Sequence, residues 1–120
     1  MLVPVKDLPS GVIGFSAEGI VTGEDYKNVL IPTVEKALEK GGKIRFLYVL
    51  GPDFKTYAPG AMWDDTLFGA RHYFDFEKIA SVTDHEVYAA MIRSFGVLMP
   101  AAVRVFAVKD IDAAKAWLAE

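Results

Sequence analysis

The side chains best suited to acid–base or metal chemistry lie in one segment of the chain. Asp64, Asp65 and His72 fall within residues 61–74, where apolar residues recur at helical spacing. Asp64 and His72 would share a helix face two turns apart, so their side chains need not touch. The helix dipole also favours adjacent carboxylates near a helix start. We interpret both aspartates as structural, with a contact to a partner molecule as the alternative.

No second group in the sequence completes a catalytic or metal site. His85 follows His72 by thirteen residues, which is not a zinc-ligand spacing, and the sequence places no acid–base partner beside it. The chain has no cysteine, which excludes disulfides, thiolate catalysis and zinc–sulfur sites. No serine lies in a Gly-x-Ser-x-Gly motif, and the glycines form no dinucleotide fingerprint. We therefore predict that the protein is not an enzyme and has no metal or cofactor.

A second set of side chains favours binding rather than catalysis. These large apolar residues and one cation follow the most apolar run of the chain, and they are Phe54, Tyr57, Met62, Trp63, Phe68 and Arg71. Either the aromatic side chains pack onto the sheet, or they form an apolar pocket or contact patch. Arg71 and Lys55 would pair with an anionic head group or, by default, with nearby carboxylates at the surface.

The apolar run at residues 46–50 predicts the strand that positions this set. It has no polar alternation, which is typical of a strand buried on both faces of a parallel sheet. Gly51 and Pro52 should end the strand. We expect a loop of ten residues next and a helix from about Ala61. Ligands of open α/β sheets usually bind at such carboxyl ends of strands.

Turn and cap residues divide the rest of the chain into short elements. Residues 2–5, broken by Pro4, predict a short edge strand that forms a hairpin with residues 12–19. Thr22, with Asp25 three residues later, predicts the start of a helix. Pro32 should distort that helix, and Gly41-Gly42 should end it.

The C-terminal half continues the alternation of strand and helix. Residues 79–82 predict a strand, and Thr83 followed by Glu86 predicts a capping box. The helix it opens carries Val87, Met91, Ile92 and Phe95, and Gly96 should end it. Residues 103–106 predict the last strand, and Asp110 should cap a last helix. The order β-β-α-β-α-β-α-β-α predicts an α/β fold with one mostly parallel five-stranded sheet and an N-terminal β-hairpin, as one domain over residues 1–120.

Composition narrows the classes of partner. The net charge is −3 without a basic run, which argues against nucleic acid. The first residues show no signal peptide, and no apolar run approaches the ~20 residues that span a bilayer, so we expect a cytoplasmic protein without stable membrane insertion. Apolar residues make up 52% of the chain, slightly above the usual ~45–50%. A ligand groove or a self-association face would use this excess, and we predict a homodimer.

Several segments together resemble one family. They are GIVTGEDY at 19–26, VLIP at 29–32, KIRFLYV at 43–49, GAMWDD at 60–65, DFEKIA at 75–80 and AWL at 116–118. In these segments the chain resembles the SpoIIAA-like family of small bacterial proteins, grouped with the STAS and CRAL-TRIO-type folds. The resemblance implies a SpoIIAA/STAS-like fold over nearly the full chain and says much less about function.

The neighbouring groups of that family imply two roles. STAS domains of the anti-sigma-factor antagonist type carry a phosphorylated serine after the matching strand. This chain reads GPDFKTY at 51–57, so Thr56 is the one aliphatic hydroxyl in that segment and a weak phosphorylation candidate. CRAL-TRIO domains hold a lipid in an apolar cavity, which Phe54, Tyr57, Met62 and Trp63 would suit. We therefore hypothesise a regulatory or protein-interaction module acting through residues 51–63, with a small lipid or apolar-ligand carrier as the alternative.

Overall fold

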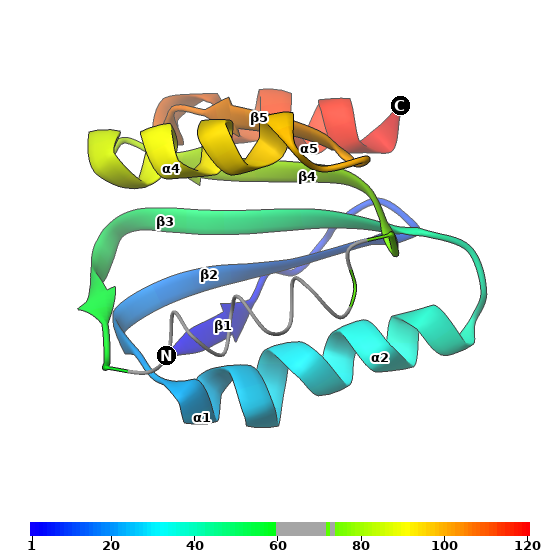
Figure 1. Ribbon diagram of the computed structural model, residues 1–120, viewed down its shortest axis with the longest axis horizontal. Coiled ribbons are helices and arrows are strands. Elements are labelled where there is room, and N and C mark those ends of the chain that lie inside the picture. The colour runs from blue at the N-terminus through cyan, green and yellow to red at the C-terminus, as the bar shows by residue number, and fades with distance from the viewer. Residues whose placement is uncertain (60–71, 73) are drawn as a thin grey trace.

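The fold is an α/β arrangement around one five-stranded sheet (Figure 1). The computed structural model describes residues 1–59, 72 and 74–120. The strands are β1 (Leu2–Pro4), β2 (Val12–Val21), β3 (Ile44–Tyr57), β4 (Phe76–Thr83) and β5 (Ala102–Phe106), and they lie in this order across the sheet. β1 pairs antiparallel with β2, and the other neighbours pair in parallel. The sheet therefore confirms the predicted N-terminal hairpin and mostly parallel topology, with β1 at an edge where Pro4 is tolerated.

Helices cover both faces of the sheet. The helical segments are α1 (Gly23–Asp25), η1 (Tyr26–Leu30), α2 (Ile31–Glu39), α4 (Glu86–Val97), η2 (Val108–Asp110) and α5 (Ile111–Ala119). Figure 1 shows α2 beside the β1–β2 side of the sheet and α4 beside β4 and β5. The predicted helix at 61–74 lies almost wholly outside the described residues, and Phe74 itself is in a turn.

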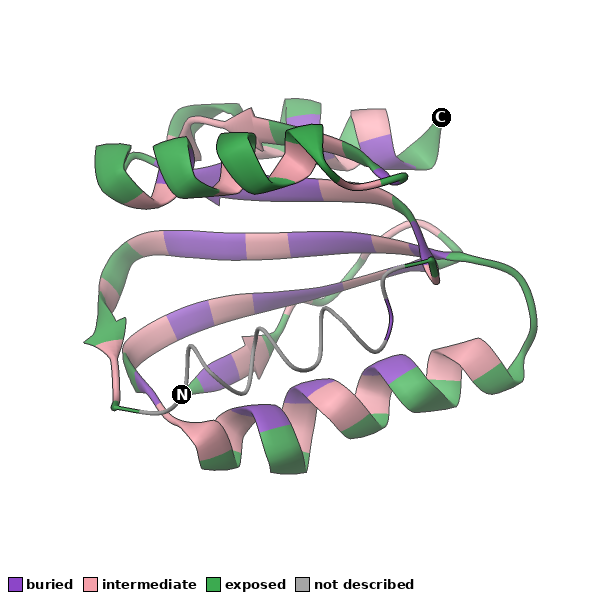
Figure 2. Cartoon of the chain, in the orientation of Figure 1, coloured by how far each residue is buried: buried purple, intermediate pink, exposed green. Residues whose placement is uncertain are grey.

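Among the described residues, the core consists of two apolar clusters, one on each face of the sheet. Figure 2 shows buried positions along β2, β3 and β4. On the first face, Phe15 and Phe46 pack with residues of the α1–η1–α2 segment, and Tyr88 of α4 packs against the same cluster. On the second face, Leu47 and Val82 pack with α5. Strands buried on both faces explain why the sequence of β3 shows no polar alternation.

The first helical segment is continuous but changes its winding before Pro32. Thr22 caps it, and the Asp25 side chain accepts from the Thr22 backbone, so the predicted capping box is confirmed. Residues Tyr26–Leu30 form a π-helical turn, in which the Ile31 N–H donates to the Tyr26 carbonyl. Pro32 has no N–H and its ring crowds the preceding turn, which accounts for the widening. The predicted distortion therefore takes the form of a wide turn.

The central strand is longer than the sequence predicts. β3 continues through Gly51 and Pro52 to Tyr57, so the expected loop after residue 50 is wrong over residues 51–57. Beyond Leu50, β3 pairs with β2 and no longer with β4, and its register against β2 shifts there. Gly19 of β2 has a φ of 60° at this bulge. Proline is tolerated because this part of β3 needs hydrogen bonds on one side alone.

The start and end of α4 also differ from the prediction. His85 is the N-cap, without a side-chain hydrogen bond, and Thr83 is the last residue of β4, so the predicted capping box is wrong. The buried Thr83 Oγ1 instead accepts from the His85 N–H at 3.0 Å. α4 runs through Gly96 to Val97. A Cβ at Gly96 would lie 2.7 Å from the Val103 Cβ, so this glycine permits close approach of α4 to β5 instead of ending the helix.

The last helix has its N-cap at Asp110, as predicted, but the Asp110 side chain makes no cap hydrogen bond. The Asp84 Oδ1 accepts from the Val108 N–H at 3.0 Å, at the start of the preceding turn η2. At the other end of α5, Arg45 donates to the Leu118 carbonyl and Lys78 to the Trp117 carbonyl. These contacts satisfy carbonyls that a helix end leaves without intrahelical partners.

Candidate functional site

A pocket of about 280 Å³ lies on the first face of the sheet, between the strands, the α1–η1–α2 segment and α4. Its floor comes from β3, β4 and β5 through Phe46, Tyr48, Leu50, Ile79, Ser81 and Val103. One wall comes from Tyr26 and Leu30 of η1. The opposite wall comes from α4 and the residues after it, through Tyr88, Met91, Ile92, Phe95 and Met99. The described lining is therefore almost entirely apolar and aromatic.

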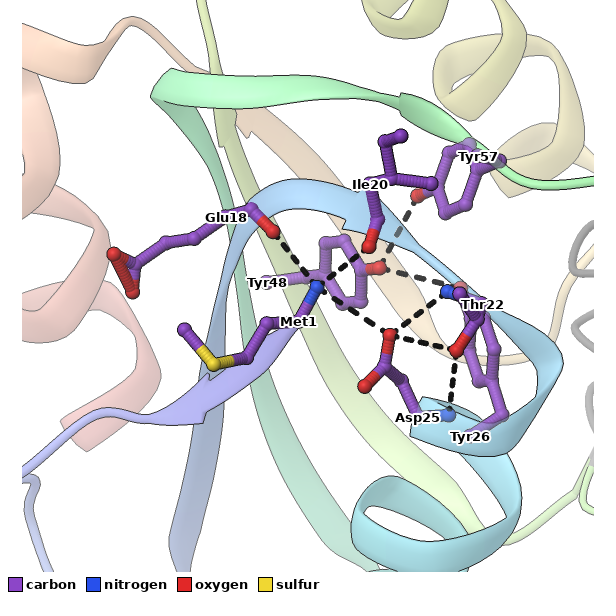
Figure 3. Close-up of polar contacts among 8 residues, drawn as sticks. All are labelled: Met1, Glu18, Ile20, Thr22, Asp25, Tyr26, Tyr48 and Tyr57. Carbon is purple, nitrogen blue, oxygen red and sulfur yellow. Dashed lines mark hydrogen bonds and ion pairs between the residues drawn. The ribbon is translucent and has the colours of Figure 1, made fainter.

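Tyrosine hydroxyls supply most of the polar groups of the pocket. The Tyr48 hydroxyl lies 3.2 Å from the Tyr26 hydroxyl and 3.1 Å from the Tyr57 hydroxyl (Figure 3). Tyr26 is fully buried in η1, and Tyr48 and Tyr57 lie at two levels of β3. Buried tyrosine hydroxyls need hydrogen-bond partners, and this chain of contacts provides them between η1 and β3.

An aromatic cluster lies at the carboxyl end of β3. Phe54 and Tyr57 meet edge to face with ring centroids 5.1 Å apart, and Tyr88 of α4 lies 5.5 Å from Phe54 and 5.7 Å from Tyr57. The His85 ring lies 4.6 Å from the Tyr88 ring. Edge-to-face packing of this kind stabilises aromatic pairs beyond the area that they bury. The cluster therefore joins the extension of β3 to the start of α4.

Ser81 is a small polar residue in the described pocket floor. It is 2% exposed, and its Oγ has no hydrogen-bond partner in the part of the chain that the structure describes. In the sheet it lies opposite Tyr48 on β3 and Val105 on β5. A buried hydroxyl without a partner is unfavourable, so this position differs from the rest of the floor.

α4 presents an apolar stripe outward. Val87, Met91, Phe95 and Leu98 recur at intervals of three or four residues, and they are 62%, 47%, 54% and 74% exposed, respectively. We call these four residues the α4 stripe. Figure 2 shows exposed ribbon along the outer side of α4. Met91 and Phe95 belong to the stripe and also line the pocket, so the α4 wall of the pocket continues onto the surface.

A charged contact fixes the start of the first helical segment beside this site (Figure 3). The Asp25 Oδ2 accepts from the Thr22 N–H at 2.8 Å and lies 3.3 Å from the α-amino group of Met1. That amino group also donates to the carbonyls of Glu18 and Ile20. Burial raises the pKa of the Asp25 carboxyl, but the hydrogen bonds from Thr22 and the Met1 charge together hold this pKa below its ordinary value.

Comparison with known proteins agrees with this architecture. A model of the SpoIIAA-like family matches residues 12–119. The chain belongs to the SpoIIAA-like family. A solved structure similar to it is an uncharacterised protein of the DUF3478 family, with a SpoIIAA-like fold, from Shewanella loihica PV-4. The two share 25% identity with a TM-score of 0.79, over 98% of this chain and 92% of that one. No curated protein matches this chain.

The structure of this SpoIIAA-like chain brings some of the predicted site residues together, and others lie outside the described residues. Phe54 and Tyr57 lie together in the aromatic cluster, and Tyr57 also lines the pocket. Lys55 and Thr56 are exposed residues of the β3 extension. The other candidate site residues lie outside the described residues, and they are Met62, Trp63, Asp64, Asp65, Phe68 and Arg71.

The two histidines of this SpoIIAA-like chain lie in different contacts. The buried His72 pairs through Nδ1 with the Asp75 Oδ2 at 2.8 Å, whereas His85 caps α4 and lies against Tyr88. The described residues contain no group of three or more His, Asp or Glu side chains that could hold a metal ion. In the same part of the chain, no helix is long and apolar enough to cross a membrane.

Sequence reasoning missed the residues that line most of the pocket. The sequence predicts Tyr26 on an apolar helix face and Tyr48 in a buried strand. Each carries a hydroxyl that needs a hydrogen-bond partner when it is buried. That requirement was a usable signal for a polar contact inside the core. Tyr88 gave a weaker signal, because it stands in a helix whose apolar residues point both to the pocket and outward. For Ser81 the sequence held no signal beyond a polar residue in an apolar strand.

Proposed function

We propose that this STAS-like domain is a non-enzymatic binding module that holds one small apolar ligand between its sheet and α4. The observation that carries the proposal is the pocket of about 280 Å³ with its apolar and aromatic lining. Ligand pockets are typically concave, mostly apolar and provided with few polar groups, which describes this lining. Their usual volume is ~300–1,000 Å³, so this pocket suits a ligand smaller than a two-chain lipid.

The chemistry of the described lining supports binding over catalysis. It contains tyrosine and serine hydroxyls but no histidine, carboxylate, lysine or arginine. General acid–base catalysis uses histidine most often and also carboxylates and lysine, and three of the tyrosine hydroxyls here already contact one another. The fold and the lining together therefore favour the apolar-ligand alternative, located on the first face of the sheet.

Methyl-detected NMR with n-hexane as the probe tests this proposal. The labelled methyl groups of Ile79, Met91 and Ile92 line the pocket, whereas Ile111 packs on the opposite face and is the internal control. Saturable shifts at the pocket methyls, with Ile111 unchanged, would support the proposal. Shifts that are uniform, or that never saturate, would reject it. Native mass spectrometry of the purified protein then shows whether a ligand co-purifies with it.

The α4 stripe supports a second role, association with another copy of the chain. Four apolar side chains, each about half exposed or more, lie along one face of α4 and its C-cap residue Leu98. Exposed apolar patches of this kind commonly mark protein interfaces, and a two-fold dimer is the simplest closed assembly. We place the interaction role of the module on this stripe. Light scattering across a wide concentration range measures it directly, and a monomer mass throughout would remove the proposal.

A further inference from the structure

Ser81 holds a buried polar group in a pocket whose described lining is mostly apolar and aromatic. Ser81 lies on β4 and is 2% exposed, and its Oγ has no hydrogen-bond partner among the described residues. The next residue of β4 on the same face, Thr83, shows the usual arrangement, because its hydroxyl accepts from the His85 N–H. Native proteins pair most buried hydroxyls, and an unpaired one therefore calls for an explanation.

The position of Ser81 connects that hydroxyl to the pocket. Ser81 lines the pocket and lies beside Tyr48 in the β3–β4 register. Its Oγ is covered in the present rotamer, and rotation about the single Cα–Cβ bond moves it between staggered positions around the pocket floor. A ligand group in the pocket can then supply the missing hydrogen bond.

The charge of the described lining restricts what that ligand group can be. The pocket residues include no cationic side chain in the part of the chain that the structure describes. A buried carboxylate or phosphate without a cation carries a large desolvation cost, whereas a hydroxyl or carbonyl needs one hydrogen bond. A serine hydroxyl can donate to a carbonyl and can either donate to or accept from an alcohol.

We infer that the pocket is selective for an uncharged ligand whose one hydroxyl or carbonyl group bonds Ser81, with its hydrocarbon part against Met91, Ile92 and Phe95. This inference rests on the proposed ligand pocket and names the class of ligand that the pocket takes. Because the described lining has no cation, a free fatty acid should bind more weakly than the alcohol of the same chain length.

Three probes of one chain length test the inference: n-hexane, 1-hexanol and hexanoate at pH 7. Each is titrated by NMR into the wild type, Ser81→Ala and the control Ser94→Ala, whose serine is exposed on α4 outside the pocket lining. Loss of one hydrogen bond should make Ser81→Ala bind 1-hexanol about three- to tenfold more weakly, which corresponds to about 0.7–1.4 kcal/mol. The affinity for n-hexane should stay within about twofold, and Ser94→Ala should change neither. In the wild type, hexanoate should bind at least about tenfold more weakly than 1-hexanol.

The outcomes separate this inference from the proposed function. Equal weakening of 1-hexanol and n-hexane by Ser81→Ala would assign Ser81 to packing and overturn the inference while the pocket stands. Tighter binding of hexanoate than of 1-hexanol would overturn it as well. If no probe shifts the pocket methyls of the wild type, the proposed function fails with it. Ser81→Ala removes a hydroxyl that has no partner among the described residues, so the variant should fold. If it does not fold, Ser81→Cys repeats the test, because a thiol has a similar shape and is a weaker hydrogen-bonding group.

Discussion

The carboxylate of Asp25 ties three separate parts of the backbone together at the start of the first helical segment. The carboxylate accepts from the Thr22 N–H and lies beside the Met1 amino group, and the backbone N–H of Asp25 donates to the Thr22 hydroxyl. Because its pKa is lowered in the folded chain, the ionised form stabilises the fold. That stability is complete above the ordinary aspartate pKa of 3.8 and is lost as the pH falls through the lower folded pKa.

Asp25→Asn should therefore lower the free energy of unfolding at pH 7 by about 1–2 kcal/mol and flatten its fall below about pH 4. Asn keeps a side-chain oxygen but has no charge to attract the α-amino group. Urea denaturation from pH 2 to 7 measures both effects. Asp112→Asn, at an exposed position in the first turn of α5, is the matched control. Parallel pH profiles for the wild type and Asp25→Asn would contradict the assignment.

At the scale of single residues, local chemistry was predictable and partners distant in the chain were not. The pairing of Thr22 with Asp25 follows from a spacing of three residues, which a helix start converts into contact. The hydroxyl contact between Tyr26 and Tyr48 joins residues 22 apart in the sequence. It depends on which helix covers which strand, and residue types alone do not contain that information.

At the scale of elements, glycine and proline led to two of the errors, because each residue type serves more than one purpose. Gly51 and Pro52 signal the end of a strand, but in this fold they lie where β3 pairs with β2 alone and a bulge accommodates them. Gly96 signals the end of a helix, yet it stands within α4 against Val103. Strand and helix types were still predictable, since apolar periodicity arises from burial and burial was inferred correctly for β3 and for η1–α2.

Gly96→Ala tests the close contact between α4 and β5. Alanine in place of glycine usually favours a helix by about 1 kcal/mol. Here the new Cβ would lie 2.7 Å from the Val103 Cβ, which is attached to the backbone and cannot rotate away. Overpacking of this kind typically costs about 1–3 kcal/mol, so we expect a net loss of roughly 1 kcal/mol. Thermal and urea unfolding measure this loss of stability, with Ser94→Ala as the exposed control. A gain in stability for Gly96→Ala would show that α4 can move away from β5 without cost.

At the scale of the whole molecule, the regular alternation of strands and helices explains why the fold was predictable. Right-handed crossovers leave few arrangements for such an order. The pocket was not predictable, because it arises where η1 and α4, which are distant in the chain, cover the same face of the sheet. The apolar excess of the sequence is consistent with what the fold shows, since α4 carries apolar side chains both toward the pocket and outward.

The two directions of α4 allow the proposed self-association and the proposed ligand binding to be tested separately by substitution. Val87 and Leu98 belong to the α4 stripe but do not line the pocket. We predict that Val87→Glu with Leu98→Glu converts a concentration-dependent dimer into a monomer, because two carboxylates per chain would have to lose their water in the interface. Multi-angle light scattering gives the mass, and the n-hexane titration shows whether the pocket is intact. Ala116→Glu, exposed on α5 across the sheet, controls for added charge and should leave the mass unchanged. A dimer that persists in the double variant would move the association face away from α4, and equal dissociation by Ala116→Glu would point to general repulsion between acidic chains.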